Sequence, residues 1–103
     1  MSYRYLATQG QRDSNEAEII KALEAVGATV EQIPTGGGVP DLLVGYLRNN
    51  YLIEVKQMPE KGKVFESQVR LNKTQLKWHL WWNGQKAVVR TPEEALHVLG
   101  IES

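Results

Sequence analysis

Apolar residues along the chain recur with two periods, one typical of helices and one typical of strands. After Asp13 they recur at helical spacing (Ile19, Ile20, Leu23), and Gly27 follows as a residue that commonly ends a helix. Short alternating or β-branched segments predict four strands, at residues 29–33, 41–46, 51–56 and 86–90. Residues that favour helix caps precede two further helical segments, at residues 72–83 and 92–99. The order αβββαβα predicts an α/β domain, with a mixed sheet because a hairpin is antiparallel and the later crossover need not be.

The segments between these elements carry residues typical of turns and loops. Three consecutive glycines, Gly36 to Gly38, predict a loop, since glycine loses the most backbone entropy inside a regular element. A turn is predicted at residues 48–50, because asparagine tolerates a positive φ. Residues 1–12 are predicted to be a flexible N-terminal arm on a single domain spanning residues 1–103.

Composition excludes several classes of protein. The chain has no apolar run near the roughly 20 residues that a membrane span needs, and its polar start lacks a signal-peptide core. It has no cysteine, which excludes disulfide scaffolds and thiolate zinc sites and fits a reducing compartment. We therefore expect a cytoplasmic protein with no membrane partner.

The net charge is zero, but the charges are unevenly distributed. Residues 13–55 carry seven acidic and two basic residues, whereas residues 56–77 carry six basic and two acidic ones. A basic segment beside a cluster of carboxylates suits a protein that grips phosphates and holds a cation between itself and them. The alternative is that the basic segment is only a solvated surface.

The third predicted strand has two charged residues in an apolar context. Because side chains alternate along a strand, Glu54 and Lys56 share one face, while Ile53 and Val55 share the other. Charged side chains are rarely buried without partners, so this face needs an explanation. A structural salt bridge would be one, and a functional site is the other.

Asp41 favours the functional explanation. It begins the second predicted strand, and the hairpin should bring it to the same end of the sheet as Glu54, where the two could share one hard cation. Mg²⁺ takes oxygen ligands, commonly one or two carboxylates, and the backbone carbonyl of Val55 could add another. Lys56 would then stabilise negative charge on a phosphate, or help to orient and deprotonate the attacking water. We expect Mg²⁺, which Mn²⁺ could replace, and no small-molecule cofactor.

These residues resemble a known nuclease signature. The sequence Gly37-Gly38-Val39-Pro40-Asp41, then twelve residues, then Glu54-Val55-Lys56 is similar to the PD-(D/E)XK motif. The predicted element order is similar to the αβββαβ core of that superfamily, a restriction-endonuclease-like core with a mixed central sheet and flanking helices. The resemblance implies a metal-dependent nuclease with Asp41, Glu54 and Lys56 in its catalytic site.

Two further residues join the site by resemblance. In this superfamily, as in archaeal-type Holliday-junction resolvases, a glutamate on the first helix often joins the metal site. Glu16 matches this glutamate. Alternatively, Glu16 could complete a capping box with Asp13. The segment 71–79 resembles the helix after the sheet in the VRR-NUC branch (virus-type replication-repair nucleases), where a glutamine faces the active site. Gln75 matches that glutamine, with a capping box to Asn72 as the alternative.

Other residues of this helix have less specific expectations. His79 is expected in the polar core or facing DNA rather than binding a metal. Trp78, Trp81 and Trp82 are expected mainly in the core or at a dimer contact, although one could stack on an unpaired base.

The resemblance also implies a partner and an assembly. We expect DNA, branched, junction or flap DNA above all, cut by an endonuclease of replication, repair or recombination in a bacterial or phage-infected cell. A symmetric homodimer would match a two-fold junction. The predicted nucleic-acid-binding residues are basic: Arg12, Lys61, Lys63, Arg70, Lys73 and Lys77. The alternatives are a nuclease-fold module that binds without cutting, a sequence-reading restriction-type enzyme, and a structural or toxin-neutralising protein with a fortuitous match.

Overall fold

A computed structural model describes residues 14–34, 36–58 and 70–102 of the chain. Three helices and four strands occur in these ranges, in the predicted order. They are α1 (Glu16–Ala25), β1 (Thr29–Gln32), β2 (Leu42–Tyr46), β3 (Asn49–Val55), α3 (Lys73–Trp81), β4 (Lys86–Val89) and α4 (Pro92–Val98). The expected arm at residues 1–12 lies outside the described residues.

The four strands form one sheet in the order β1-β2-β3-β4. β1 pairs with β2 and β2 with β3 in antiparallel fashion, whereas β3 and β4 are parallel. The mixed sheet of the α/β prediction is therefore confirmed. Its parallel pair places the end of β4 beside the end of β3, where Lys56 follows the last residue of the strand.

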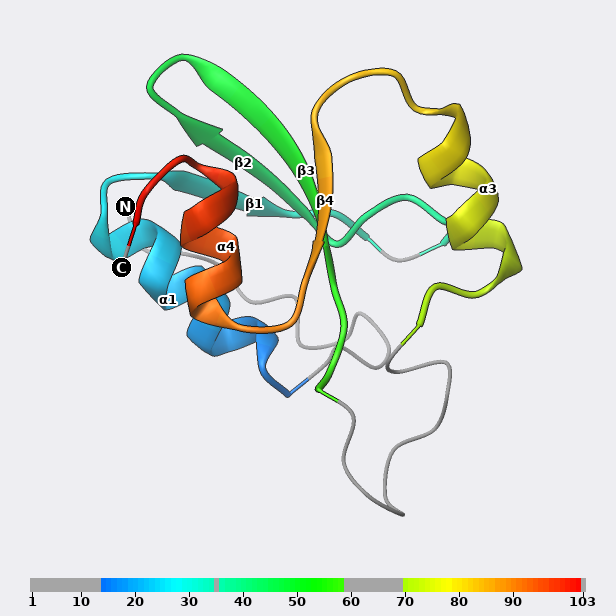
Figure 1. The fold of residues 1–103 in the computed structure, drawn as a ribbon, viewed down its shortest axis with the longest axis horizontal. Helices are drawn as coiled ribbons and strands as arrows, with labels where there is room; N and C mark the ends of the chain where they lie inside the picture. Colours follow the sequence, from blue (N-terminus) through cyan, green and yellow to red (C-terminus); the bar gives the residue numbers. More distant parts are fainter. Residues whose placement is uncertain (1–13, 35, 59–69, 103) are drawn as a thin grey trace.

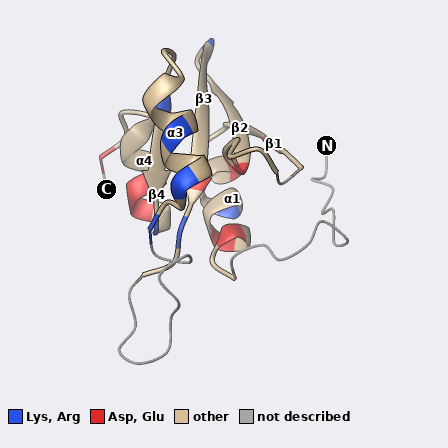
Figure 2. Ribbon diagram, turned by 90° about the vertical axis from the view of Figure 1, so that its right-hand side faces the viewer, with Lys and Arg blue, Asp and Glu red and all other residues tan. Residues whose placement is uncertain are grey.

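The helices lie on opposite sides of the sheet. Figure 1 shows α1 and α4 together on one side, where their contact is the most extensive between helices, and α3 apart from them. In the view of Figure 2, α3 lies in front of β3 and β4. The hydrophobic core fills the layer between the sheet and the α1–α4 pair. Its fully buried members are Ile19, Ile20, Leu23, Leu42, Val44, Ile53, Val55, Val89 and Ala95.

The capping signals before α3 and α4 correspond to the observed helix starts, whereas α1 begins at Glu16, after Asn15 rather than after Asp13. Asn72 caps α3 through its side chain, which accepts a hydrogen bond from the backbone N–H of Gln75 at 2.8 Å. Thr91 caps α4 in the same way, accepting from Glu94 N–H at 3.1 Å, and Pro92 occupies the first turn. Beyond α1, Gly27 has a φ of 94°, which an L-residue rarely adopts.

The predicted turn at residues 48–50 is wrong by one position. β2 and β3 pair as far as Tyr46 and Asn49, so the hairpin turns through Leu47 and Arg48 alone. These two residues have φ values of 48° and 70°, as a two-residue turn between twisted strands requires. The asparagines were expected to adopt this conformation, but Asn49 and Asn50 belong to β3. The pairing of β2 with β3 along their full length therefore outweighs the preference of asparagine for a turn position.

None of the helices in the described ranges is long and apolar enough to cross a membrane.

Candidate functional site

Asp41 and Glu54 lie at the same end of the sheet. The last pair between β2 and β3 is Leu42 with Ile53, and Asp41 and Glu54 are the next residues outward. Asp41 accepts a hydrogen bond from the backbone N–H of Val55 through Oδ2, at 2.8 Å. Its carbonyl accepts from Ile33 N–H, also at 2.8 Å. Asp41 is therefore held from both sides, by the end of β1 and by the end of β3.

Glu54 and Lys56 are both buried, and Glu54 contacts α3. Their exposed fractions are 2% and 5%, values that are rare for charged side chains. Glu54 Oε2 accepts a hydrogen bond at 3.1 Å from the side-chain amide of Gln75 on α3. Lys56 donates its backbone N–H to Val89 O at 2.9 Å, so its main chain continues the β3–β4 pairing. The end of β3 thus carries an acid and a base inside the protein.

Gln75 combines the two roles that its sequence context suggested as alternatives. Its Oε1 accepts from the backbone N–H of Asn72 at 3.0 Å, which completes the capping box. Its Nε2 donates to Glu54 at the same time. Because the capping contact fixes the side-chain amide, the other end of that amide is directed at the carboxylate.

A hollow of about 440 Å³ lies between the glycine loop and the start of α3. Its lining includes Asp41 and Gln75, so it opens beside the candidate site. Gly38 permits the close approach of the loop to α3: a Cβ at this position would lie 2.5 Å from the carbonyl oxygen of Thr74. The remaining lining residues are Gly36, Gly37, Gly38, Val39, Asn72 and Thr74.

Glu16 occupies the buried stripe of α1, where it is 3% exposed. Its Oε2 accepts a hydrogen bond at 2.9 Å from Gln32, whose side chain is also buried. The alternative of a capping box with Asp13 is wrong, because α1 has Asn15 at its N-cap position and Glu16 is its first residue rather than its third. Within the described ranges, no three acidic or histidine side chains lie close enough together to hold a metal ion. The structure therefore brings Asp41 and Glu54 together, without adding Glu16 to a three-ligand cluster.

Asn15 is a residue that the sequence patterns did not single out. It occupies the N-cap position of α1, yet its side chain makes no capping bond. Instead, its Nδ2 donates to Lys56 O at 3.0 Å and to Arg90 O at 2.7 Å. One amide thus connects the start of α1 to the ends of two strands. A cap-favouring residue was the only signal for it, and the signal did not indicate these partners.

The basic residues predicted to bind nucleic acid divide into two groups. Arg70, Lys73 and Lys77 are described and exposed. Figure 2 shows blue segments along α3, whose two lysines are Lys73 and Lys77. The others, Arg12, Lys61 and Lys63, lie outside the described residues.

The aromatic residues at the end of α3 differ in their surroundings. Trp78 and Trp82 are partly buried and stacked, with ring centroids 5.2 Å apart and planes 12° apart. His79 is buried, and its Nε2 has no hydrogen-bond partner among the described residues. Burial, and secondarily the charge of Lys86, lower the pKa of His79 from its usual value. Trp81 is exposed, so only one of the three tryptophans offers its ring to a partner.

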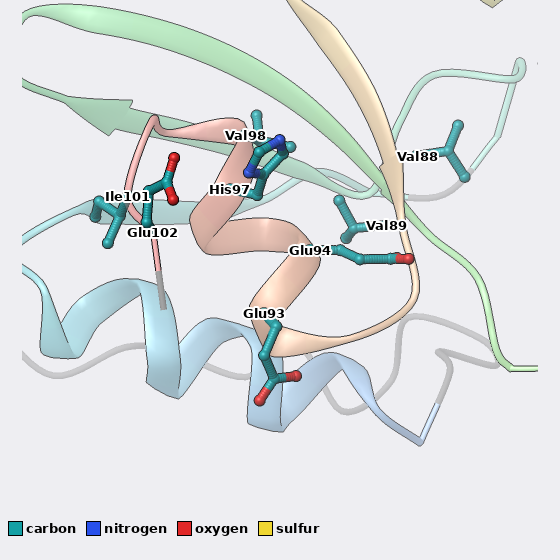
Figure 3. A pocket seen from close by; sticks show the side chains of 8 residues that line it. All are labelled: Val88, Val89, Glu93, Glu94, His97, Val98, Ile101 and Glu102. Carbon is teal, nitrogen blue, oxygen red and sulfur yellow. The ribbon is translucent and has the colours of Figure 1, made fainter.

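A second hollow, of about 450 Å³, lies between β4 and α4 (Figure 3). Figure 3 shows two of its acidic residues, Glu93 and Glu102, at opposite ends of the hollow. A third, Glu94, accepts a hydrogen bond from Arg90 N–H at 2.6 Å. None of the residues predicted for the site lines this hollow, and its acids are too dispersed to form a catalytic group.

Comparisons with known proteins bear on the fold. No known family profile and no curated protein matches the sequence. A solved structure described as "VRR_NUC domain" matches this chain with a TM-score of 0.59 and 21% sequence identity. The match covers 85% of this chain and 97% of that one. At this identity the likeness shows the fold: the chain has the fold of a VRR-NUC domain, as the motif spacing predicted.

The contacts of Asn15 predict that its amide stabilises the protein. Replacing Asn15 with Ala would remove a hydrogen bond from each of two carbonyls, which should cost about 1–3 kcal/mol of unfolding free energy. Asn15→Asp should cost at least as much, because an oxygen would then face both carbonyls. Urea denaturation measures the loss. Ser14→Ala, at an exposed neighbour, is the control, and equal unfolding free energies for all variants would contradict the prediction.

The buried imidazole of His79 predicts a dependence of stability on pH. Its pKa is lowered in the folded protein, so the unfolded chain takes up a proton near pH 6.5 that the folded chain binds only at lower pH. The unfolding free energy should therefore fall as the pH drops below about 6.5. Urea denaturation between about pH 7.5 and pH 5.5 tests this. His79→Gln should remove that part of the decline, whereas a variant of the exposed histidine, His97→Gln, should keep it. If the unfolding free energy of His79→Gln still fell to the same extent, another titrating group would be its cause.

Proposed function

We propose that the chain is a divalent-metal-dependent nuclease that hydrolyses phosphodiester bonds of DNA at Asp41, Glu54 and Lys56. The observation that carries the proposal is the grouping of these residues at one end of the sheet. The carboxylate of Asp41 accepts a hydrogen bond from the N–H of Val55, and the two residues on either side of Val55 in the sequence, Glu54 and Lys56, have buried side chains. The shared fold with a VRR-NUC domain supports it.

The donor atoms at this end of the sheet suit a hard cation. Asp41 and Glu54 offer carboxylate oxygens from adjacent strands. The N–H and the carbonyl of one residue leave an extended strand on the same edge, so the carbonyl of Val55 faces the Asp41 side as its N–H does. An all-oxygen set of this kind fits Mg²⁺, or Mn²⁺ in its place. When bound, the ion would supply Lewis acidity and lower the pKa of a bound water.

The side chains around this position have separate roles in the proposal. The N–H of Val55 orients the carboxylate of Asp41, and Gln75 orients that of Glu54. Lys56 stabilises negative charge on the phosphate or orients the attacking water. Glu16 is an accessory acid, linked through Gln32 to the strand that neighbours Asp41. Burial of Glu54 and Lys56 strengthens each of these electrostatic interactions by excluding water.

The surface around the hollow suits a DNA backbone. The hollow beside Asp41 would admit the phosphate to be cut, while Arg70, Lys73 and Lys77 contact the flanking backbone. Arg12, Lys61 and Lys63 extend this contact in the proposal. We propose branched, junction or flap DNA as the substrate, in replication, repair or recombination in the cytoplasm of a bacterial or phage-infected cell.

A symmetric homodimer is part of the same proposal. Two sites related by a two-fold axis would match the symmetry of a four-way junction and cut two strands of one substrate. Because Trp78 and Trp82 are stacked on each other, the three tryptophans offer less apolar surface for such a contact than their number suggests.

Three substitutions test the catalytic assignment. Asp41→Asn, Glu54→Gln and Lys56→Ala should each lower the cleavage rate by about 100-fold or more, because each removes a charge from the reacting position. Labelled four-way junction, flap, duplex and single-stranded DNA, incubated with Mg²⁺, Mn²⁺ or EDTA, provide the assay. EDTA should abolish cleavage by the unsubstituted chain.

Exposed residues of the same charge provide the matched controls. Glu31→Gln and Lys21→Ala should leave the rate unchanged. Cleavage of none of the four substrates by the unsubstituted chain with metal present would overturn the nuclease proposal and favour a module that binds without cutting. If all three site variants cleaved at the rate of the unsubstituted chain, the catalytic residues would have to lie elsewhere in the chain.

Light scattering at micromolar concentration tests the assembly. The proposal expects twice the 11.6 kDa mass of one chain. A monomer both free and on junction DNA would contradict the symmetric arrangement while leaving the chemistry of the site untouched.

A further inference from the structure

α3 carries a basic and aromatic surface on the side opposite its contacts with the sheet. Positions 73, 77 and 81 follow at intervals of four residues, so Lys73, Lys77 and Trp81 are neighbours along one side of the helix. All three are exposed. Leu76 and Leu80 lie beside them, and we call these five residues the outer face of α3.

Trp81 is exposed, whereas the other two tryptophans, Trp78 and Trp82, are partly buried. The ring of Trp82 stacks on Trp78 and lies at 57° to that of Trp81, with centroids 6.0 Å apart. Trp81 is 71% exposed. A large aromatic ring in water is a feature of surfaces that bind a partner, because burying it against another flat group is favourable.

A shallow hollow of about 400 Å³ adjoins this ring. It is lined by Trp81, Trp82, Asn83 and Gly84, just beyond the end of α3. Gly84 permits the ring of Trp82 to lie close to the backbone, since a Cβ there would lie 2.8 Å from Nε1 of Trp82. A flat group that stacks on Trp81 would therefore have space beside the ring, with the Asn83 amide at its edge.

The charge of the outer face discriminates between partners. α3 contains two lysines and no acidic residue. In a two-fold contact of this face with a second copy, the same patch would meet itself, and lysines would face lysines. Like charges across an interface are unfavourable, whereas a polyanion complements them. The aromatic ring and the two lysines together match single-stranded nucleic acid, whose phosphates and bases alternate along one chain.

We propose that Lys73, Lys77 and Trp81 form a track for an unpaired DNA strand, with Trp81 stacking on a base. This deepens the proposed nuclease function, because it selects substrates that have unpaired bases next to the cut. The lysines bind the backbone of the strand between the hollow at Asp41 and the ring of Trp81.

The length of the helix fixes how far the stacked base lies from the site. Gln75 contacts Glu54, and Trp81 lies six residues later, which is about 9 Å along the helix axis. A stacked strand advances about 3.4 Å per nucleotide, and the helix itself is about 10 Å across, so Trp81 would meet a base at least about three nucleotides from the phosphate at the site. Shorter unpaired segments would not reach it.

Binding of tailed duplexes tests the track. Fluorescence anisotropy in EDTA, which prevents cleavage, compares a labelled blunt hairpin duplex with the same duplex bearing a tail of about two or about six nucleotides. Trp81→Ala should weaken binding of the longer tail by about 5- to 150-fold and leave the blunt duplex unchanged. Trp81→Phe, which keeps an aromatic ring, should retain most of the affinity.

Leu80→Ala is the matched control, because Leu80 is 78% exposed on the same face and has no ring. It should bind all three duplexes as the unsubstituted chain does. Equal affinity of Trp81→Ala and the unsubstituted chain for the longer tail would overturn the proposal. The proposal would also be overturned if Trp81→Ala and Leu80→Ala lost affinity equally and both changed the mass measured by light scattering. That result would indicate that the outer face binds a second copy of the chain.

Failure of this inference is distinguishable from failure of the nuclease proposal. Cleavage that needs Asp41 and Glu54 but is indifferent to Trp81 would remove the track and keep the enzyme. Tail-dependent binding that needs Trp81, without cleavage in Mg²⁺ or Mn²⁺, would keep the track and remove the enzyme.

Discussion

The hydrogen bond between the Val55 N–H and the carboxylate of Asp41 is the contact on which the geometry of the candidate site depends. Backbone pairing of β2 with β3 ends at Leu42 and Ile53, so the side chain of Asp41 takes over where the ladder stops. The carbonyl of the same residue binds Ile33, next to the end of β1. Three strands are therefore joined at one residue, and its carboxylate has a defined direction next to Glu54.

Buried charge on both faces of the sheet is a cost to the fold that packing alone does not explain. Glu16 lies among the apolar residues of α1, while Glu54 and Lys56 lie beneath α3. Each glutamate accepts a hydrogen bond from a glutamine amide, Gln32 for one and Gln75 for the other. A neutral donor satisfies a carboxylate oxygen without cancelling its charge. These two hydrogen bonds therefore orient a carboxylate on each side of the strand end.

The sequence predicted the elements and the grouping of Asp41 with Glu54, because both follow from periodicities and from the antiparallel geometry of a hairpin. It placed the turn wrongly, since Asn49 and Asn50 have the local preference but Leu47 and Arg48 lie where the paired strands end. The tie from Asn15 to Lys56 and Arg90 joins positions 41 and 75 residues apart, and no local pattern indicates such contacts. The sequence presents a helix cap and a site residue as alternative roles for Gln75. One side-chain amide serves both, because its oxygen accepts from the cap and its nitrogen donates to Glu54.

That double use of Gln75 makes α3 the element that connects chemistry to substrate. The capping box fixes the first turn of the helix, and the amide held in that box contacts Glu54. Because α3 is rigid, the distance from Glu54 to Trp81 is set by the rise and the thickness of the helix rather than by a flexible side chain. Lysines on the outer face of α3 attract any nucleic acid, whereas a stacking ring discriminates in favour of bases that are free of a duplex. In the proposed nuclease, a single domain would therefore prefer branched DNA without a separate recognition domain, because the same helix would orient the acid and present the ring.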